Sequence, residues 1–305
     1  MGDFDMPTIS LGQGRTGRVL PLMVMVLVLG VVCTSASFAA SVASRGDGRA
    51  LIAEHPTDPH SYITFAEYLQ KEGKWGQAEQ VLELGRNKAD SSAELLVALG
   101  TVHEHQNQLE KAEAVTRAAL ALDPKSVFAH IRMGEIYLQL GWPKSGLESF
   151  ETAHGLAPEM ALPKVRIVGA MVEQDLLTEA EDECLKFISS DVENADLWLA
   201  LGQVFESQNK LQAAFTTYGQ VLTLGTRQAE AYARQGRLFC RFGQYDAGKA
   251  ACAQSLAIDD QNILAHAYMG IACSNLGEGD SAREHAKIAE AGGMNMNAVW
   301  DKLMQ

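Results

Sequence analysis

The stretch Trp198-Leu199-Ala200-Leu201-Gly202 decides the fold, because its pattern of large and small side chains returns at a fixed interval along the chain. Phe205, Ala214 and Tyr218 follow it at positions that also recur. The position of Ala214 holds alanine or glycine in seven copies, each 34 residues from the next: Ala78, Ala112, Gly146, Ala180, Ala214, Gly248 and Ala282. Seven copies in register without an insertion indicate a tandem repeat.

A second column of mostly small residues lies twelve positions before the first: Ala66, Gly100, Gly134, Val168, Gly202, Gly236 and Gly270. The residue just before each of these is usually large and apolar, as at Leu99, Leu201 and Met269. Small residues at facing positions let two helix backbones approach, and the large neighbour fills the space that remains. Each copy is therefore predicted to be a hairpin of two helices, and the protein to be all-α.

Residues that tolerate a positive φ angle fall between the two predicted helices of a copy: Gly73, Asn107, Gly141, Asn209, Gly243 and Gly277. Glycine and asparagine adopt the left-handed conformation that commonly ends a helix. Asp123-Pro124 and Ala157-Pro158 mark the passage from one copy to the next, since proline cannot continue the second helix. The sequence thus predicts where each hairpin turns.

These columns resemble those of the tetratricopeptide repeat family, whose consensus has Trp, Leu, Gly and Tyr in the first helix, Ala, Phe and Ala in the second, and Pro near the end. The seven copies, numbered one to seven, span residues 59–296, about 78% of the chain. Copy five, with Trp198 and Gly202, is the clearest match, and copy three has Gly134 and Phe150 in the expected columns. The resemblance implies a right-handed α-solenoid of seven helix-turn-helix repeats, whose first helices line a concave face.

Copies four and six depart from the pattern. Copy four has Lys164 in an aromatic column and Val168 in place of a small residue, and copy six has Gln235 in a core column. We expect looser hairpins in these two copies. Residues 44–58 are predicted to form a linker and an amino-terminal cap, and residues 297–305 a capping helix that covers the last hairpin.

The amino terminus, residues 1–43, has the order of a signal peptide or a single-pass signal anchor. Two arginines precede an uncharged apolar run over residues 19–32, and small residues follow it. Cleavage before Ala40 would release the rest as a periplasmic or otherwise extracytoplasmic protein. If cleavage does not occur, residues 19–43 would form an apolar helix that anchors the chain in the membrane. In both alternatives the basic residues stay inside and the repeats are exported.

The composition argues against several classes of function. The 305 residues include 38 Asp and Glu against 25 Lys and Arg, a formal net charge of −13, which argues against a nucleic acid as the partner. The five Cys show no zinc-site spacing. His103 and His105 would point to different sides of a helix and make a poor metal pair. We therefore expect no cofactor, no metal site and no catalytic residue, and interpret the chain as a non-enzyme.

If first helices line a concave face, as the resemblance implies, copies three and four bring six apolar side chains to it: Phe128, Ile131, Leu138, Leu162, Val165 and Val172. Six apolar side chains there exceed what a solvated surface needs. We hypothesise that this strip receives the apolar side of a partner helix or an extended peptide. The alternative is that some of these residues pack against the neighbouring copy.

Five arginines follow the same face: Arg132, Arg166, Arg234, Arg237 and Arg241. They are candidates for holding an acidic segment of a partner, because the guanidinium group suits carboxylates. The alternative is pairing within the molecule, for example between Arg132 and Glu135, which stand three residues apart on one helix. Glu135 is therefore a candidate groove residue as well.

Cys240, Cys252 and Cys273 fall in neighbouring predicted helices, where buried small apolar side chains are the ordinary interpretation. Disulfides form in oxidising compartments outside the cytoplasm. Cys252 and Cys273 are therefore a candidate disulfide if their Cα atoms come within about 7 Å.

These features together indicate a scaffold or adaptor that binds a protein or peptide in its concave groove. Exported repeat proteins of this size resemble periplasmic factors that assist the assembly of pilus, secretion or other envelope complexes. Two alternatives stay open. One is an accessory or targeting subunit of an envelope enzyme or of a cytochrome-maturation system, and the other is a repeat protein that self-associates into a coat.

Overall fold

The computed structural model describes residues 48–297, and this part of the chain forms fifteen helices and no strand. A short helix, α2 (Gly48–Glu54), comes first. Seven hairpins follow: α3 (Pro59–Lys71) with α4 (Trp75–Lys88), α5 (Ala93–His105) with α6 (Leu109–Leu122), α7 (Val127–Gln139) with α8 (Pro143–Leu156), α9 (Ala161–Glu173) with α10 (Leu177–Ser190), α11 (Ala195–Ser207) with α12 (Leu211–Leu224), α13 (Gln228–Arg241) with α14 (Tyr245–Ile258), and α15 (Ile263–Asn275) with α16 (Gly279–Ala291). The prediction of an all-α repeat fold is confirmed.

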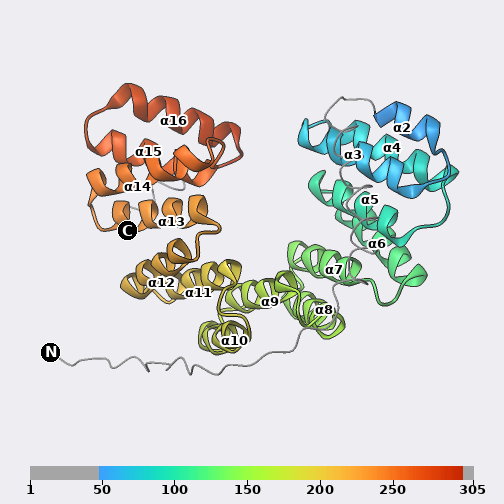
Figure 1. Cartoon of the computed structure of the whole chain (residues 1–305), viewed down its shortest axis with the longest axis horizontal. Helices are drawn as coiled ribbons and strands as arrows, with labels where there is room; N and C mark the ends of the chain where they lie inside the picture. Colours follow the sequence, from blue (N-terminus) through green and yellow to red (C-terminus); the bar gives the residue numbers. More distant parts are fainter. Residues whose placement is uncertain (1–47, 298–305) are drawn as a thin grey trace, which may run out of the picture.

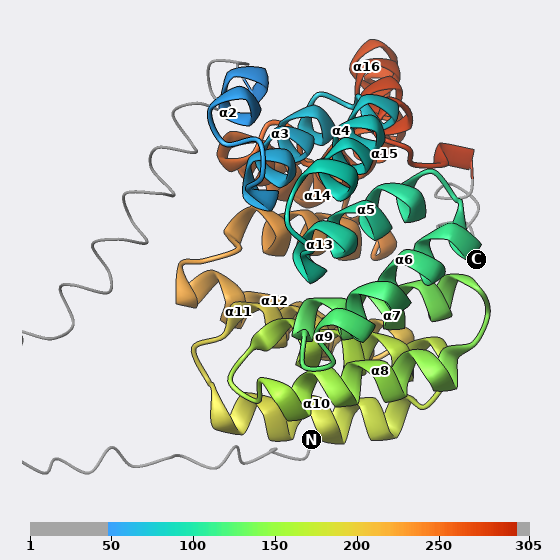
Figure 2. The same cartoon turned by 90° about the vertical axis from the view of Figure 1, so that its right-hand side faces the viewer.

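The hairpins stack side by side into a curved arc (Figure 1). Helices α2–α6 form one arm, α13–α16 form the other, and α7–α12 form the base between them. At the base, α7 and α9 lie on the inner side of the curve, and their partners α8 and α10 lie on the outer side. Figure 2 shows the arc from the side of α2–α6, with the other arm behind. At the base of the arc, first helices therefore line the concave face, as the resemblance implies.

The two ends of the chain frame this arc. At the start, α2 packs on α3, and Gly48 lies against the ring of Phe65. The apolar helix predicted over residues 19–43 and the capping helix predicted over residues 297–305 lie outside the described residues, except for Asn297. Within residues 48–297, no helix combines the length and the apolar character needed to cross a membrane.

The hairpin turns lie where the sequence predicts them. Each predicted turn residue has a positive φ angle, as at Gly73 with 71° and Asn107 with 58°. Copy four has Asp175 in this column, with a φ of 60°, a residue that the pattern of Gly and Asn did not include. Backbone N–H groups of the turn close the helix end, and that of Gly73 donates to the carbonyl oxygen of Gln70 over 2.9 Å.

Most first helices begin at a side-chain cap. In five of the seven copies, the residue just before the helix has a side-chain oxygen that accepts a hydrogen bond from a backbone N–H of the first turn. These capping residues are Asp58, Ser92, Ser126, Asn194 and Asn262. Such a cap stabilises a helix by about 1 kcal/mol. Met160 before α9 and Arg227 before α13 provide no side-chain cap. The starts of these two helices therefore depend on packing.

The small residues of the repeat mark the places where the two helices of a hairpin touch. A Cβ atom added to Gly134 would lie 2.5 Å from Cε1 of Phe150, and one added to Gly202 would lie 2.2 Å from Cε1 of Tyr218. Both rings are fully buried. Burial of apolar surface stabilises the fold by roughly 25 cal/mol per Å². The absence of a side chain at these glycines is therefore what allows the large rings to be buried.

The two copies that depart from the pattern differ from each other. In copy four, α9 and α10 pack less closely than the two helices of any other hairpin of the described chain, as predicted, and Val168 stands there in the column that is otherwise Ala or Gly. In copy six the prediction is wrong, since α13 and α14 pack most closely of all. A Cβ atom added to Gly236 or Gly248 would lie 3.3 Å from the carbonyl oxygen of the other, and Gln235 is buried with a hydrogen bond to Phe215 O.

The fourth residue of four first helices ties its helix to the preceding connection. Its side chain makes a hydrogen bond to the backbone carbonyl oxygen six residues earlier: Tyr62 to Pro56, His130 to Pro124, Trp198 to Val192, and His266 to Asp260. A carbonyl oxygen only accepts, so Nε2 of His266 carries the hydrogen and its Nδ1 is an acceptor. The two histidines in this column are therefore structural.

The pair formed by His266 and His285 is expected to make stability depend on pH. Their Nδ1 atoms lie 2.8 Å apart, and His285 must donate because Nδ1 of His266 accepts. Burial and the neighbouring His266 lower the pKa of His285 from its ordinary value of 6.5, while Glu284 acts in the opposite direction. His285 therefore binds a proton more readily in the unfolded chain than in the folded protein. The stability that the neutral pair contributes is therefore complete above the unfolded pKa and is lost as the pH falls toward the lower folded pKa.

Urea unfolding followed by circular dichroism tests this expectation. The midpoint should be lower at about pH 5.5 than at about pH 7.5, and the difference should shrink in His285→Gln. His60 is the matched control, because its side chain is 72% exposed and His60→Gln should leave the difference unchanged. An equal difference in the wild type and in His285→Gln would contradict the role given to this pair.

The connection between α12 and α13 interrupts the regular stacking. Gly225 and Arg227 both have positive φ angles, of 76° and 55°, and α13 begins at Gln228, one residue before the position that the repeat predicts. The first helices α9 and α11 pack closely, and so do α13 and α15, but α11 and α13 barely touch. A gap therefore opens on the concave side between copies five and six.

Candidate partner-binding groove

The six apolar residues predicted for the concave face divide into exposed and buried ones. Phe128 and Leu162 are 56% and 38% exposed and stand on neighbouring first helices, α7 and α9. Ile131 is 3% exposed and belongs to the core shared by copies three to five, so its placement as a groove residue is wrong. The reason is that its side chain packs into the layer that the next hairpin covers.

The other three apolar residues are half-buried and pack against that same core: Leu138, Val165 and Val172. Leu138 covers Gly146 within its own hairpin, where an added Cβ atom would lie 2.9 Å from Cδ2 of the leucine. Val165 also reaches the concave surface, where it lines a pocket. The structure thus divides the predicted strip into an exposed part on α7 and α9 and a part that joins neighbouring copies.

The arginines of copies three and four bind carboxylates of neighbouring copies. Arg132 pairs with Glu104 of copy two and with Glu135 of its own helix, each at 2.6 Å. Arg166 of copy four pairs with the other oxygen of Glu135 at 2.7 Å. The intramolecular pairing of Arg132 with Glu135 is therefore confirmed, and it is part of a longer series. The series joins α5, α7 and α9, and we call it the charge ladder. Its members are Glu104, Arg132, Glu135 and Arg166.

The arginines of copy six are engaged to different degrees. Arg234 is 14% exposed and pairs with Glu230 on its own helix at 2.7 Å. Arg241 is exposed, and its only hydrogen bond among those of the described residues is a long one of 3.4 Å to Oδ1 of Asn209. Arg241 therefore keeps most of its N–H groups in water, where they can donate to a partner, whereas Arg234 does not.

Glu206 is the most enclosed carboxylate beside these arginines, with 9% of its side chain exposed. Its Oε1 accepts a hydrogen bond of 2.6 Å from the hydroxyl of Tyr218 and a second one from Arg237. Burial acts to lower the pKa of Arg237, but Glu206, with smaller contributions from Tyr268 and Tyr218, acts in the opposite direction and the pKa is raised. Burial and the same carboxylate raise the pKa of Tyr218. Arg237 therefore joins copies five and six and is not free to bind a partner.

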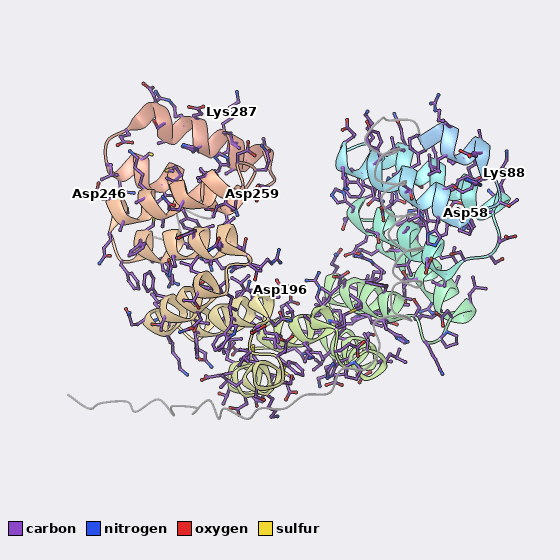
Figure 3. The ribbon with its side chains drawn as sticks, viewed as in Figure 1. Asp58, Lys88, Asp196, Asp246, Asp259 and Lys287 are labelled. Atoms are coloured by element: carbon purple, nitrogen blue, oxygen red, sulfur yellow. The ribbon has the colours of Figure 1, made fainter. Side chains whose placement is uncertain are left out.

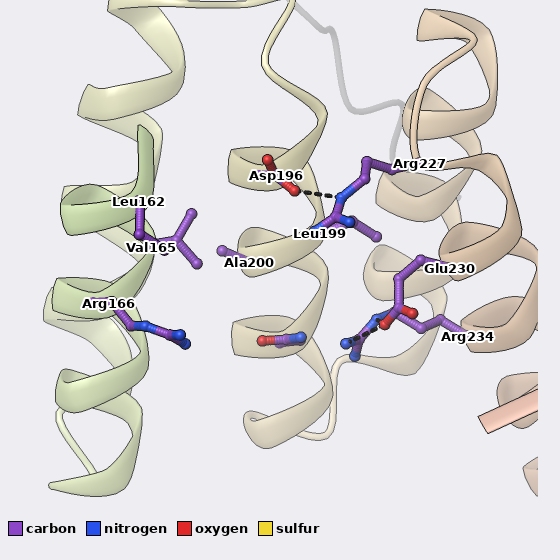
Figure 4. A pocket seen from close by; sticks show the side chains of 10 residues that line it. Leu162, Val165, Arg166, Asp196, Leu199, Ala200, Arg227, Glu230 and Arg234 are labelled. Atoms are coloured by element: carbon purple, nitrogen blue, oxygen red, sulfur yellow. Dashed lines mark hydrogen bonds and ion pairs between the residues drawn. The ribbon is translucent and has the colours of Figure 1, made fainter. Parts of the chain in front are cut away.

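A pocket of about 250 Å³ opens on the concave face between α9, α11 and α13 (Figure 4). Its apolar side is formed by Leu162, Val165 and Leu199. Arg166 extends toward α11 from one side, and Arg234 lies on the opposite side. The pocket therefore combines an apolar wall with two guanidinium groups.

An ion pair closes one end of this pocket. Nε of Arg227, in the α12–α13 connection, lies 2.6 Å from Oδ1 of Asp196 on α11. Figure 3 shows Asp196 at the inner edge of the arc. Both side chains are well exposed, 60% for Arg227 and 43% for Asp196, so the pair lies at the surface of the groove.

Sequence reasoning found four residues of the pocket, namely Leu162, Val165, Arg166 and Arg234. It missed six: Asp196, Leu199, Ala200, Gln203, Arg227 and Glu230. Five of the six stand in the same columns as the predicted groove residues, so carrying those columns into copies five and six would have found them. Arg227 lies in a connection between helices, where no column of the repeat indicates a functional position.

Cys252 and Cys273 are free, buried thiols, so the candidate disulfide is not formed in this structure. Their sulfur atoms face different neighbours. Sγ of Cys252 packs against Gly236 inside the hairpin, whereas burial and a hydrogen bond with Glu278 raise the pKa of Cys273. Burial also raises the pKa of Cys240 to about 12. These cysteines act as buried small side chains.

The two histidines of α5 point to different neighbours. His103 is 3% exposed, and its Nδ1 lies 3.9 Å from Glu79. His105 stacks on Trp75, with ring centroids 3.5 Å apart and planes inclined by 11°. Across residues 48–297, no group of three or more His, Cys, Asp and Glu side chains is arranged to hold a metal ion.

Comparison with known proteins agrees with the repeat pattern. A family model described as tetratricopeptide repeat matches residues 63–127. No curated protein matches the chain in sequence. Similar solved structures include a tetratricopeptide repeat protein from Parabacteroides merdae ATCC 43184, with 17% identity, coverage of 81% of this chain and 99% of that one, and a TM-score of 0.59.

Two further structures are similar over most of the chain. Yeast Tom70 is 12% identical, with coverage of 87% of this chain and 59% of that one, and a TM-score of 0.67. pilF of Pseudomonas aeruginosa is 17% identical, with coverage of 68% of this chain and 94% of that one, and a TM-score of 0.50. At these identities the likeness shows the fold. Together with the family model over residues 63–127 and the seven hairpins, it supports the resemblance of the chain to the tetratricopeptide repeat family.

Proposed function

We propose that the chain is a non-enzymatic scaffold that binds a segment of a partner protein on its concave face. Repeat proteins of this fold generally act by binding other proteins, and their surface is extended enough for a partner to lie along several copies. The observation that carries the proposal is the pair of large apolar side chains, Phe128 and Leu162, exposed on neighbouring first helices. Exposed apolar side chains that gather on one concave face are typical of interaction sites.

We further propose that the scaffold works outside the cytoplasm and assists the assembly of an envelope complex, such as a pilus or a secretion apparatus. The support for this step is the amino-terminal sequence, in which an apolar run over residues 19–32 follows two arginines and precedes small residues. Either a cleaved signal or a retained anchor would place the repeats in the same compartment. The net charge of −13 favours a protein partner over a nucleic acid.

Replacing Phe128 with aspartate is expected to remove the partner without unfolding the protein. The side chain is 56% exposed, so the charge remains solvated while the apolar contact is lost. We expect recovery of the partner from the protein's own envelope fraction, measured by affinity capture and mass spectrometry, to fall about ten-fold. The helical signal in circular dichroism should be unchanged.

Ile258→Asp is the matched control. Ile258 is 54% exposed but stands at the end of α14, which is a second helix. The control should capture the same partners as the wild type. Equal capture by Phe128→Asp and the wild type, or equal loss in both variants, would contradict binding on the concave face.

A further inference from the structure

The pocket between α9, α11 and α13 exists because the charge ladder stops there. Ala200 on α11 occupies the column that holds Arg132, Arg166 and Arg234 in other copies. Gly169 on α9 occupies the column of Glu135, and a Cβ atom added to it would meet no atom within 4 Å. Long charged side chains therefore line the groove between α5 and α9, whereas small residues leave room for the pocket beside α11.

The opposite boundary of the pocket is open for a different reason. The positive φ angles of Gly225 and Arg227 turn the chain so that α11 and α13 barely touch. Arg234, on α13, lies on the side of the pocket opposite Arg166, beside the side-chain amide of Gln203 on α11. The small residues on one side and the turned connection on the other form the pocket together.

The pocket lining is more basic than the rest of the protein. It contains three arginines and two carboxylates, whereas the whole chain has a net charge of −13. Arg166 is 45% exposed and uses one terminal nitrogen for its ion pair with Glu135. Its other N–H groups have no acceptor among the hydrogen bonds of the described residues. A guanidinium group in this state can still donate to a second carboxylate.

The size of the pocket limits what can enter it. Sites for whole small molecules usually measure roughly 300–1,000 Å³. A volume of about 250 Å³ suits one or two side chains of a polypeptide that runs along the groove. The apolar wall of Leu162, Val165 and Leu199 lies beside the guanidinium group of Arg166, so an apolar and an anionic group would be received together.

We propose that this pocket recognises a partner segment that carries an acidic side chain next to an apolar one, with the carboxylate bound by Arg166 and the apolar side chain placed against Val165 and Leu199. The inference rests on the proposed function, since it names the chemistry of the segment that the groove binds. Asp196 and Glu230 pair with Arg227 and Arg234 inside the pocket, so they offset two of the three positive charges and leave Arg166 as the principal donor.

Selection of random twelve-residue peptides displayed on phage against the full chain tests the proposal. We expect the enriched peptides to combine Asp or Glu with Leu, Ile or Phe within a few residues. Arg166→Ala should weaken their binding about ten-fold, and Asp→Asn or Glu→Gln in the peptide should do the same. In the double-mutant cycle the two losses should not add, because both remove the same contact.

Two controls keep the test specific to the pocket. Arg117 on α6 is 64% exposed and, like Arg166, pairs with a glutamate, in this case Glu113 on its own helix, so Arg117→Ala should bind the peptides as well as the wild type. Arg166→Lys should keep part of the affinity, which shows that loss in Arg166→Ala does not come from unfolding.

The outcomes separate this inference from the proposed function. Peptides whose binding is lost in Phe128→Asp but not in Arg166→Ala would leave the groove as the binding surface and overturn the acidic recognition. Enriched peptides without acidic residues, or losses that add in the cycle, would overturn it as well. If binding is insensitive to both variants, the proposed function and the inference fail together.

Discussion

Gly202→Ala is expected to lower the free energy of unfolding by about 1–3 kcal/mol, although alanine is normally the better helix former. The added Cβ atom would lie 2.2 Å from Cε1 and 2.7 Å from Cζ of Tyr218. The ring cannot move away easily. It is fully buried, its hydroxyl donates to Glu206, and Arg234 lies 5.8 Å from its centroid. Chemical denaturation followed at 222 nm measures the change.

Gly169→Ala is the matched control for this substitution. Gly169 also stands inside a first helix, but an added Cβ atom would meet no atom within 4 Å. Here the better helix propensity of alanine acts alone, and a gain of about 0.5–1 kcal/mol is expected. The two variants should therefore shift the midpoint in opposite directions. A gain in stability for Gly202→Ala would show that the α11 and α12 backbones can separate at little cost.

Glu206→Ala is expected to destabilise the fold by about 3–5 kcal/mol, the largest effect of a single polar substitution that we predict. The variant leaves Arg237 partly buried without its carboxylate, and the Tyr218 hydroxyl loses its acceptor. An uncompensated charge away from water costs more than the ion pair contributes. Glu206→Gln should cost less, because an amide oxygen still accepts from Tyr218.

A double-mutant cycle with Arg237→Ala shows where the loss comes from. Removing both partners should recover much of the stability lost in Glu206→Ala, since no unpaired charge remains. Asp280→Ala is a control at the surface, because Asp280 and its partner Arg283 are 97% and 77% exposed, and the midpoint should stay unchanged. A double variant that is no more stable than Glu206→Ala would contradict this account.

The fold was predictable because its main constraints repeat. Facing small residues such as Gly202 and Ala214, and turn residues such as Gly73, depend on backbone geometry that recurs at every copy. The exception is instructive. Gln235 suggested a loose sixth hairpin, yet Gly236 and Gly248 bring α13 and α14 together more closely than any other pair of helices. The backbone contact therefore outweighed one polar side chain in the core.

The candidate site was less predictable, because it depends on side-chain choices between copies. Phe128 lies on the surface, and Ile131, three residues later on the same helix, lies in the core. Their columns in the repeat do not show how the next hairpin covers each residue. Arg227 gave no signal, since arginine has no preference for the left-handed conformation that it adopts. The pocket arises from that turn together with the small side chain of Ala200, which stands in a column where other copies have arginine.

The sparse contact between α11 and α13 also has a mechanical consequence. A stack of hairpins bends most easily where neighbouring first helices approach each other least closely, and here this place lies between α11 and α13, which the Arg237–Glu206 ion pair still joins. A change in curvature at this place alters the distance between Arg234 and Ala200, which stand on opposite sides of the pocket. The spacing of the two arms and the width of the pocket are therefore coupled.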